Sequence, residues 1–381
     1  MQPDIFFTKL EEQLQKGKPF VAYRKPSEKS GLTKAWLQNT KETHSTSSFS
    51  ESGFVFSPFN SSKKAYLIPS ENAEEIYMEY AAENIKEVNR KSAEFPPAFT
   101  NADAKIKHEK LVQKGIDSIK KGAFKKVVLS RSEQVETQLK AIEIFKNLLK
   151  KYPTAFVYYW FHPATGSWLG ATPESLLEVE RNKFKTMALA GTQAYKGTID
   201  SHWREKEIEE QQIVTDAIFE NLKNKVSGKI ARSEPYTSRA GNLLHLKTDI
   251  QGNLNTKNTN LKQLISALHP TPAVCGLPKE KAKRFILENE TYDREFYSGF
   301  LGELNIKVEN KRNSNRRNQE NRAYASISRK TDLFVNLRCM KLEEGKANLF
   351  IGGGITKDSK PAEEWEETVN KSHTIKSVLV K

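Results

Sequence analysis

The chain has 381 residues, enough for one large α/β domain or two domains of ordinary size, and 37% of them are hydrophobic, including 20 phenylalanines that can supply a core. The formal net charge of +14 leaves nucleic acid, an anionic membrane or an acidic substrate open as a partner. Two cysteines without a Cys-x-x-Cys pair exclude a disulfide framework and a zinc ribbon, and the lack of a signal-peptide pattern or an apolar run of ~18 residues predicts a soluble, cytoplasmic protein with no membrane partner.

Residues 1–97 predict a short N-terminal α/β region packed on a main fold. Short apolar pieces at residues 20–23 and 53–56 alternate with Ser/Thr-rich linkers, which indicates short strands, and a helix is expected over residues 73–88. The Pro-containing breaker at residues 94–98 marks the expected boundary with a catalytic domain over residues 98–381.

After this boundary, strands and helices are interspersed along the chain. The patterns predict helices over residues 104–122, 141–150, 261–268 and 279–288, and strands over residues 125–131, 155–161, 168–175, 183–188, 245–252, 297–304, 332–340 and 347–351. Residues 309–330 contain a polar, basic, nonperiodic run that is interpreted as a flexible insert. Strands joined by hairpins with helices among them indicate an α+β fold with mixed, mainly antiparallel sheets.

Two acidic helices carry the strongest chemical signal. The last helix is expected from about residue 359 to 379, and its Glu364 and Glu367 share one face with Lys371. On an earlier helix, Glu207 and Glu210 lead into a buried stripe in the same way. Four carboxylates with room for water suit Mg²⁺, so a magnesium site between the helices is the first hypothesis. The alternative is that acids in a first turn simply complement the helix dipole.

Three other motifs have both a functional and a structural interpretation. Lys126 precedes an apolar run, where desolvation would make it a base, but taken alone its position favours a strand-end lysine with its charge in water. Glu174 follows Thr172-Pro173 at the end of a strand, where an acid is usually solvated. Gly352, Gly353 and Gly354 could offer backbone N–H groups to an anion or form a turn, and no P-loop follows them.

Taken in order, these motifs resemble those of the chorismate-utilising enzymes over residues 104–373. The resemblance rests on residues 126–131, 170–174, 189–192, 206–211, 269–279, 296–299, 336–338, 352–354, 364–368 and 370–371. Within that group the chain is most similar to the isochorismate synthases. Anthranilate synthases typically have Gln at the position of Lys126 and commonly Thr at the position of Ala273. The resemblance implies the large antiparallel sheets and surrounding helices of that fold.

The resemblance also implies an activity and a set of roles. The activity is the reversible, Mg²⁺-dependent conversion of chorismate to isochorismate, for menaquinone or siderophore biosynthesis, by a monomer. Lys126 would activate water for attack at ring carbon two, and Glu174 would protonate the hydroxyl that leaves carbon four. Glu210 and Glu367 would bind Mg²⁺ directly, and Glu207 and Glu364 through water. The substrate would contact Gly191, Thr192, His269, Ala273, Tyr297, Arg338, Gly352, Gly353, Gly354 and Lys371.

Three alternatives stay open at this point. A salicylate synthase would share the lysine, the glutamate and Mg²⁺ and then expel pyruvate, and an anthranilate synthase component I would form anthranilate from ammonia. From a different class, a noncatalytic protein could hold nucleic acid through the basic insert. Lysines and glutamates alternate elsewhere and no basic stripe with interleaved aromatics is visible, so we do not expect a nucleic-acid partner.

Overall fold

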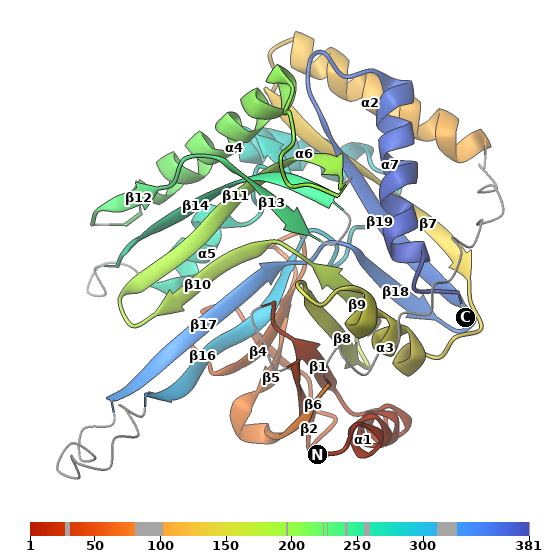
Figure 1. Cartoon of the computed structure of the whole chain (residues 1–381), viewed down its shortest axis with the longest axis vertical. Helices are drawn as coiled ribbons and strands as arrows, with labels where there is room; N and C mark the ends of the chain where they lie inside the picture. The colour runs from red at the N-terminus through yellow and green to blue at the C-terminus, as the bar shows by residue number, and fades with distance from the viewer. Residues whose placement is uncertain are drawn as a thin grey trace.

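The computed structural model describes residues 1–26, 31–80, 102–195, 197–223, 225–226, 228–240, 243–254, 260–310 and 326–380. Within these ranges, two large antiparallel sheets pack together and helices cover their outer faces (Figure 1). This arrangement confirms the expected α+β fold with mainly antiparallel sheets. None of the described helices combines the length and the apolar composition that crossing a membrane requires.

The first sheet has nine strands among the described residues, in the spatial order β15-β7-β19-β18-β9-β8-β1-β2-β6. Their bounds are β1 Phe20–Arg24, β2 Leu32–Gln38, β6 Ala73–Glu79, β7 Lys126–Glu136, β8 Phe156–His162, β9 Gly166–Thr172, β15 Gly276–Leu277, β18 Cys339–Glu343 and β19 Lys346–Ile355. The sheet therefore joins strands from the N-terminal region to strands near the C-terminus.

The second sheet has the order β12-β14-β11-β10-β17-β16-β4-β5-β3 in the described chain, and β13 pairs with β14 off this path. Its strands are β3 His44–Thr46, β4 Gly53–Ser57, β5 Ala65–Pro69, β10 Ser175–Glu180, β11 Lys183–Ala194, β12 Ile230–Arg232, β13 Tyr236–Ala240, β14 Leu243–Asn253, β16 Phe300–Asn310 and β17 Ser326–Val335.

Side chains alternate between the two faces of the first sheet, and each face has its own core. Val21 and Tyr23 of β1 point toward the second sheet and meet an aromatic core that includes Phe54 and Trp160. Phe20 of the same strand points the other way, into a core shared with helices. Burial on both faces explains why these strands are apolar along their whole length.

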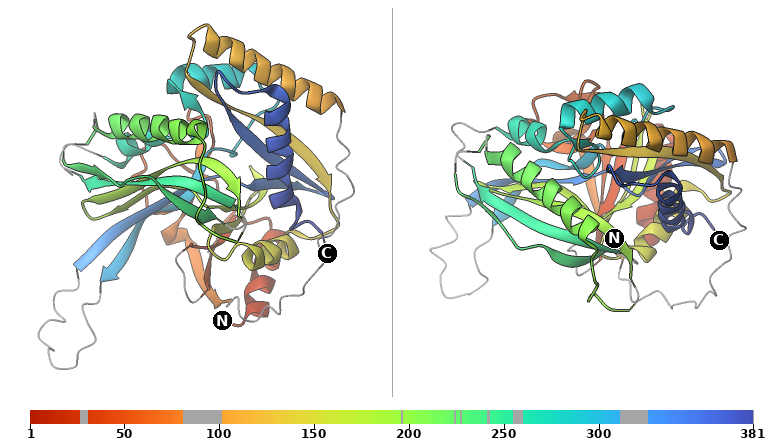
Figure 2. Two further views of the ribbon diagram at one scale, coloured as in Figure 1. Left: turned by 45° about the horizontal axis from the view of Figure 1, so that its top comes forward. Right: turned by 90° about the horizontal axis from the view of Figure 1, so that it is seen from above.

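Seven helices and one short 3-10 helix lie within the described residues. They are α1 Pro3–Gln15, η1 Ser70–Asn72, α2 Ala102–Lys120, α3 Ala141–Lys151, α4 Glu205–Lys223, α5 Leu261–Leu268, α6 Lys279–Asn289 and α7 Pro361–Lys376. α4 lies along β11 and β14 of the second sheet, whereas α7 lies along β19 of the first sheet (Figures 1 and 2). The two acidic helices thus cover different sheets.

At two points near the acidic ends of α4 and α7, the chain passes from one sheet to the other. β9 of the first sheet continues through Pro173 and Glu174 into β10 of the second sheet. β17 of the second sheet continues through Arg338 into β18 of the first, and Arg338 has a positive φ of 48°, which is uncommon for a residue with a side chain. Both crossings bring a charged residue to the seam between the sheets.

The expected helix over residues 73–88 is wrong where it can be tested. Residues 73–79 form strand β6, paired with β2 from Ala73 to Glu79, with Ile76 and Met78 buried on one face. The glutamates of this segment favour a helix, but pairing with an open strand edge prevails over local propensity. Helix α1 was not expected, and residues 81–88, the breaker at 94–98 and residues 311–325 of the insert lie outside the described ranges.

Candidate active site

A cavity of about 210 Å³ opens at the seam between the sheets, beside the first turns of α4 and α7. Charged residues from five separate parts of the chain line it together with backbone glycines and apolar side chains. The residues used below are Lys126, Glu174, Gly191, Arg204, Glu207, Glu210, His245, Ala273, Tyr297, Arg338, Gly352, Gly354, Glu367 and Lys371. The sequence analysis had proposed all of these except Arg204 and His245 as site residues.

Lys126 begins β7 and its side chain is only 2% exposed. The next residue along the strand, Val127, points to the opposite face and packs with α2 and α6, so Lys126 is directed into the cavity. Its Nζ donates a hydrogen bond to Glu210 Oε1 over 2.6 Å. Lys126 is therefore not a strand-end lysine with its charge in water. That description fits the neighbouring residue Lys125, which is exposed.

Glu174 lies at the first crossing between the sheets and is 3% exposed, so it is not the solvated strand-end acid of the alternative interpretation. Burial raises the pKa of its carboxyl to about 7, against the opposing effects of the Thr271 hydroxyl and the nearby cations Lys126 and Arg338. A carboxyl with this pKa keeps its proton in an appreciable fraction of molecules at neutral pH. It can therefore act as a proton donor.

Arg338 lies at the second crossing, and His245 of β14 holds its guanidinium. Arg338 Nη2 is 2.9 Å from His245 Nε2, and His245 Nδ1 is 2.9 Å from the carbonyl oxygen of Gly191. Because a carbonyl only accepts, the imidazole proton sits on Nδ1, and Nε2 accepts from the guanidinium. Burial and the charge of Arg338 lower the pKa of His245 to about 3, which keeps the ring neutral.

The glycine triplet lies inside β19 rather than in a turn. β7 pairs with β19 as far as Ile355, whereas β18 pairs with it only as far as Leu349, so one edge of the triplet faces the cavity. Lys371 Nζ from α7 reaches this edge and donates to the Gly352 carbonyl oxygen over 3.1 Å. The buried Tyr297 hydroxyl lies beside Gly352, where a Cβ atom would be only 2.7 Å away.

The acidic residues of α4 and α7 approach two adjacent glycines of β19. A Cβ on Gly354 would lie 2.9 Å from Glu210 Oε1, and a Cβ on Gly353 would lie 3.4 Å from Glu364 Oε2 and 4.0 Å from Glu367 Oε1. The absence of side chains at these glycines therefore lets carboxylates from both helices come near one stretch of backbone. Among the described residues, no three His, Cys, Asp or Glu side chains are grouped closely enough to hold a metal ion.

The other three carboxylates that line the cavity, those of Glu207, Glu210 and Glu367, each pair with a cation. Glu210 pairs with Lys126, and Glu367 Oε1 lies 2.6 Å from Lys371 Nζ. Glu207 caps its own helix, because its Oε2 accepts from the Arg204 backbone N–H over 2.8 Å and its Oε1 accepts from the Arg204 guanidinium over 2.5 and 2.9 Å. The cavity thus contains three internal ion pairs.

Three other proposed site residues lie outside the cavity lining, and the side chain of a fourth is not described. Glu364 is buried on α7 and Gly353 lies in β19, but neither is among the residues that line the cavity. His269 is also outside the lining, and its ring packs against Phe300 and bonds to the Pro58 carbonyl oxygen at 3.3 Å. Thr192 follows Gly191 in β11, and its side chain lies outside the described part of the structure.

A fully buried ion pair supports the strand that carries Lys126. Arg294 and Glu290 are hydrogen bonded over 2.6 Å, and both side chains are 2% exposed. Glu290 accepts from the Ser130 backbone N–H, and Arg294 donates to the carbonyl oxygens of Val128 and Val274. The sequence analysis identified neither this ion pair nor His245 as part of the site. The residues that they contact, such as Ser130 for Glu290 and Gly191 for His245, are distant in the sequence.

Residues 59–310 match a family model described as chorismate binding enzyme, and residues 323–377 match a second model with that description. Isochorismate synthase EntC of Escherichia coli K12 is 30% identical in an alignment of 268 positions that covers 67% of this chain and 62% of the relative. The chain therefore spans less than two thirds of the length of that relative.

Solved structures show the same fold. The menaquinone-specific isochorismate synthase MenF of Escherichia coli superposes with a TM-score of 0.72 at 19% identity, over 95% of this chain and 89% of that chain. Anthranilate synthase component I of Streptococcus pneumoniae superposes with a TM-score of 0.63 at 20% identity, over 88% and 82% of the two chains.

Proposed function

Because this chain belongs to the chorismate-binding enzyme family, we propose that it is an isochorismate synthase, which interconverts chorismate and isochorismate. The observation that carries the proposal is a buried lysine, Lys126, and a buried carboxyl, Glu174, that line one cavity. The reaction adds the oxygen of water at ring carbon two and releases the hydroxyl from carbon four. It therefore requires one group that takes a proton and one that gives a proton.

Glu174 is the proposed acid. A hydroxyl leaves a ring carbon far more readily as water, so a proton must reach its oxygen as the bond breaks. The pKa of about 7 means that Glu174 holds such a proton near neutral pH, which a solvated glutamate would not. In the reverse direction, the Glu174 carboxylate would take the proton back.

Lys126 is the proposed base. In its neutral form, its amine would take one proton from the attacking water as the new carbon–oxygen bond forms at ring carbon two. The proton taken by Lys126 and the proton given by Glu174 balance, so the substrate gains and loses one water in total. Burial of both groups excludes bulk water from the reacting carbons.

Chorismate is a dicarboxylate, and the cavity offers two cationic side chains for it. Arg338 is held in place by neutral His245, which accepts a hydrogen bond without adding a charge that would compete for the guanidinium. Lys371 is anchored at the open edge of β19 by the Gly352 carbonyl oxygen. We assign substrate carboxylate binding to Arg338 and Lys371.

Mg²⁺ is the proposed cofactor, since its preferred ligands are carboxylate oxygens and water. Glu210 and Glu367 would bind it directly, with Glu207 and Glu364 acting through water. The support is that Glu207 and Glu210 of α4 and Glu367 of α7 line the same cavity. The bound ion would offset the charge of the ring carboxylate.

The proposal is tested by incubating the purified protein with chorismate and Mg²⁺ and identifying the products by chromatography and mass spectrometry. Isochorismate is expected. Salicylate with pyruvate would instead indicate a salicylate synthase, and ammonia-dependent anthranilate an anthranilate synthase. Lys126→Ala should abolish turnover while chorismate still binds. Deletion of residues 311–325, which follow β16 and precede β17, should leave turnover nearly unchanged, contrary to a nucleic-acid-binding role.

A further inference from the structure

Arg204, which no sequence motif singled out, lies at the outer end of the cavity. It is one of the residues that line the cavity, yet its side chain is 76% exposed. The other cations of the lining lie deeper, since Lys126 is buried, Arg338 is partly buried and Lys371 is 28% exposed. Arg204 is therefore the cation that a solute arriving from solvent meets first.

Arg204 is held at this entrance although its side chain is in solvent. The preceding residue, Trp203, is buried with Leu244 of β14, and its Nε1 donates to Thr237 Oγ1 over 2.9 Å. The Arg204 guanidinium donates to Glu207 through Nε and Nη2. A guanidinium has five N–H groups, so at this exposure the others remain accessible to water and to an incoming anion.

Acidic side chains surround Arg204 at the entrance. The hydrogen bond to Glu207 is the main cause that raises the pKa of Arg204, and the charges of Glu363 and Glu367 on α7 add to it. Arg204 is therefore close enough to both acidic helices to feel their charges. Without its guanidinium, the Glu207 carboxylate would lose its cation, and a dicarboxylate would meet an entrance dominated by negative charge.

We propose that Arg204 is the entrance cation of this site, which draws the dicarboxylate substrate past the acids of α4 and α7 into the cavity. The proposal rests on the proposed function, from which the charge of the substrate follows. A charge of opposite sign at the entrance of a cleft speeds the encounter with an ionic substrate by about tenfold or more, and the effect falls as ionic strength rises. Arg338 and Lys371 then bind the carboxylates deeper in the cavity.

Arg204→Gln tests the charge alone, because glutamine keeps a donor for Glu207 and the helix cap uses the backbone N–H of residue 204. At about 0.02 M NaCl, kcat/KM for chorismate should fall about tenfold through KM, with kcat within about twofold of the wild type. At about 0.5 M NaCl the loss should shrink to about twofold, because salt shortens the Debye length to a few ångströms. The measurement is the initial rate of chorismate consumption, whichever product forms.

Arg232→Gln is the matched control. Arg232 is 44% exposed and pairs with Asp216 over 2.6 Å, which is ~18 Å further along α4, and it lies outside the cavity lining. This variant should keep the kcat/KM and the salt dependence of the wild type. Arg204→Lys retains the charge without the planar guanidinium, so its kcat/KM should stay within about threefold of the wild type.

If Arg204 only holds Glu207 in place, Arg204→Gln will change kcat or the free energy of unfolding but leave the salt dependence of kcat/KM at its wild-type value. That result would overturn the inference, as would equal losses for Arg204→Gln and Arg232→Gln, and the proposed function would survive both. A product other than isochorismate would overturn the proposed function, while a salt-dependent loss in Arg204→Gln would still support the entrance cation. If chorismate is not consumed, equilibrium dialysis gives its Kd instead, and absence of binding would overturn both proposals.

Discussion

At the scale of single residues, the chemistry of this site comes from burial. Glu174 and Glu178 are four residues apart on either side of the start of β10, yet their surroundings differ. Glu178 is partly exposed and pairs with Lys330 over 2.8 Å, whereas Glu174 is buried at the crossing between the sheets. Only the buried carboxyl has a pKa raised to about 7 by desolvation.

We expect kcat to fall as the pH rises above about 7. The Glu174 carboxyl, whose pKa is raised to about 7, keeps its proton below that pH and loses it above. Each further pH unit should cost about tenfold in rate. Glu174→Gln should lower kcat at least about 100-fold below pH 7, since an amide cannot donate a proton in this way, and the difference should shrink as the wild-type acid loses its proton. The measurement is isochorismate formation between pH 5.5 and 9.

Glu178→Gln is the matched control for this prediction, because it makes the same substitution at a partly exposed position outside the cavity lining. It should keep the wild-type pH profile. A Glu174→Gln enzyme with substantial turnover, or a wild-type kcat that stays level from pH 6 to 9, would contradict the assignment of Glu174 as the acid.

At the scale of elements, strand β19 lies between the acidic helices α4 and α7 and Lys126, the proposed base. The strand continues beyond its neighbour β18, and its glycines allow side chains from two helices to approach the backbone. The contacts at Gly354 are the ends of flexible side chains, Glu210 and Lys126, whereas the nearest contacts at Gly353 are at ordinary van der Waals distances. A methyl group at Gly354 would therefore displace the ends of the Glu210 and Lys126 side chains and would leave the backbone of the fold little changed.

Gly354→Ala should reduce kcat/KM about 100-fold, because misplacement of reacting groups by about 1 Å can have that effect. The free energy of unfolding should change by less than about 1 kcal/mol, since flexible side chains can move aside. Gly353→Ala should have a clearly smaller effect on kcat/KM. Steady-state kinetics and denaturant unfolding of both variants test this, and equal losses of activity would reject the special role of Gly354.

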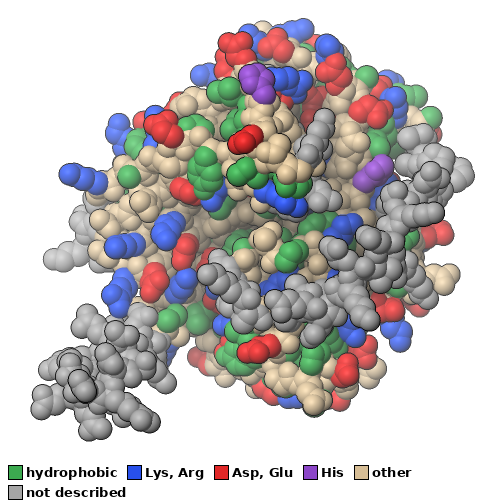
Figure 3. Space-filling model, viewed as in Figure 1, with side chains coloured by type: hydrophobic (Ala, Val, Ile, Leu, Met, Phe, Trp, Pro, Cys, Tyr) green, Lys and Arg blue, Asp and Glu red, His purple; other side chains and the backbone are tan. Residues whose placement is uncertain are grey.

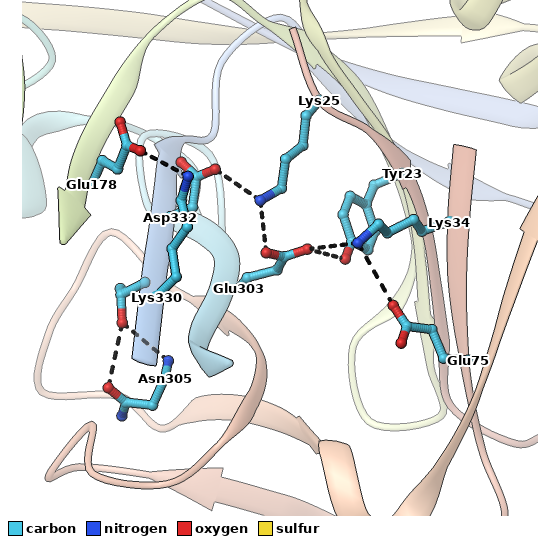
Figure 4. Close-up of polar contacts among 10 residues, drawn as sticks. Tyr23, Lys25, Lys34, Glu75, Glu178, Glu303, Asn305, Lys330 and Asp332 are labelled. Carbon is cyan, nitrogen blue, oxygen red and sulfur yellow. Dashed lines mark hydrogen bonds and ion pairs between the residues drawn. The ribbon is translucent and has the colours of Figure 1, made fainter. Parts of the chain in front are cut away.

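At the scale of the whole molecule, a buried ionic cluster joins the two sheets away from the active site (Figure 4). Glu303 of β16 and Asp332 of β17 are direct cross-strand partners, an arrangement in which two like charges repel. Lys25, which follows β1 of the other sheet, donates to Glu303 over 2.6 Å and to Asp332 over 2.9 Å, and Tyr23 donates to Glu303 over 2.5 Å. Lys25 thus bridges the acid pair and links the sheets.

Lys25→Met should destabilise the protein by about 3–5 kcal/mol, because it leaves buried acids without their cation. Lys9→Met is the control, since Lys9 pairs with Glu74 at the surface and should contribute less than about 1 kcal/mol. Denaturant unfolding followed by tryptophan fluorescence measures both. Equal effects of the two substitutions would show that the cluster does not hold the sheets together.

One face of the molecule shows how its charged side chains are distributed. On the face drawn in Figure 3, lysines and arginines are interspersed with aspartates and glutamates rather than gathered into one patch. A mixed surface of this kind does not favour binding along a phosphate backbone. The net charge of +14 is therefore compatible with a small anionic substrate.

The sequence by itself determined the elements whose patterns are local. Helix α5 and the start of α6 fall where periodicity and breakers place them, and the spacing of Glu207 with Glu210 and of Glu364 with Glu367 follows from helical geometry alone. The order of the motifs was sufficient to identify the enzyme family, which the family models over residues 59–310 and 323–377 confirm.

The tertiary structure decided whatever depends on partners that are far apart in the sequence. It made residues 73–79 a strand by pairing them with β2, it buried Glu174, and it placed His245 between Gly191 and Arg338. It also paired Glu207, Glu210 and Glu367 of the cavity with cations. Burial and ion pairing depend on distances between segments up to hundreds of residues apart, and no local pattern of side chains encodes those distances.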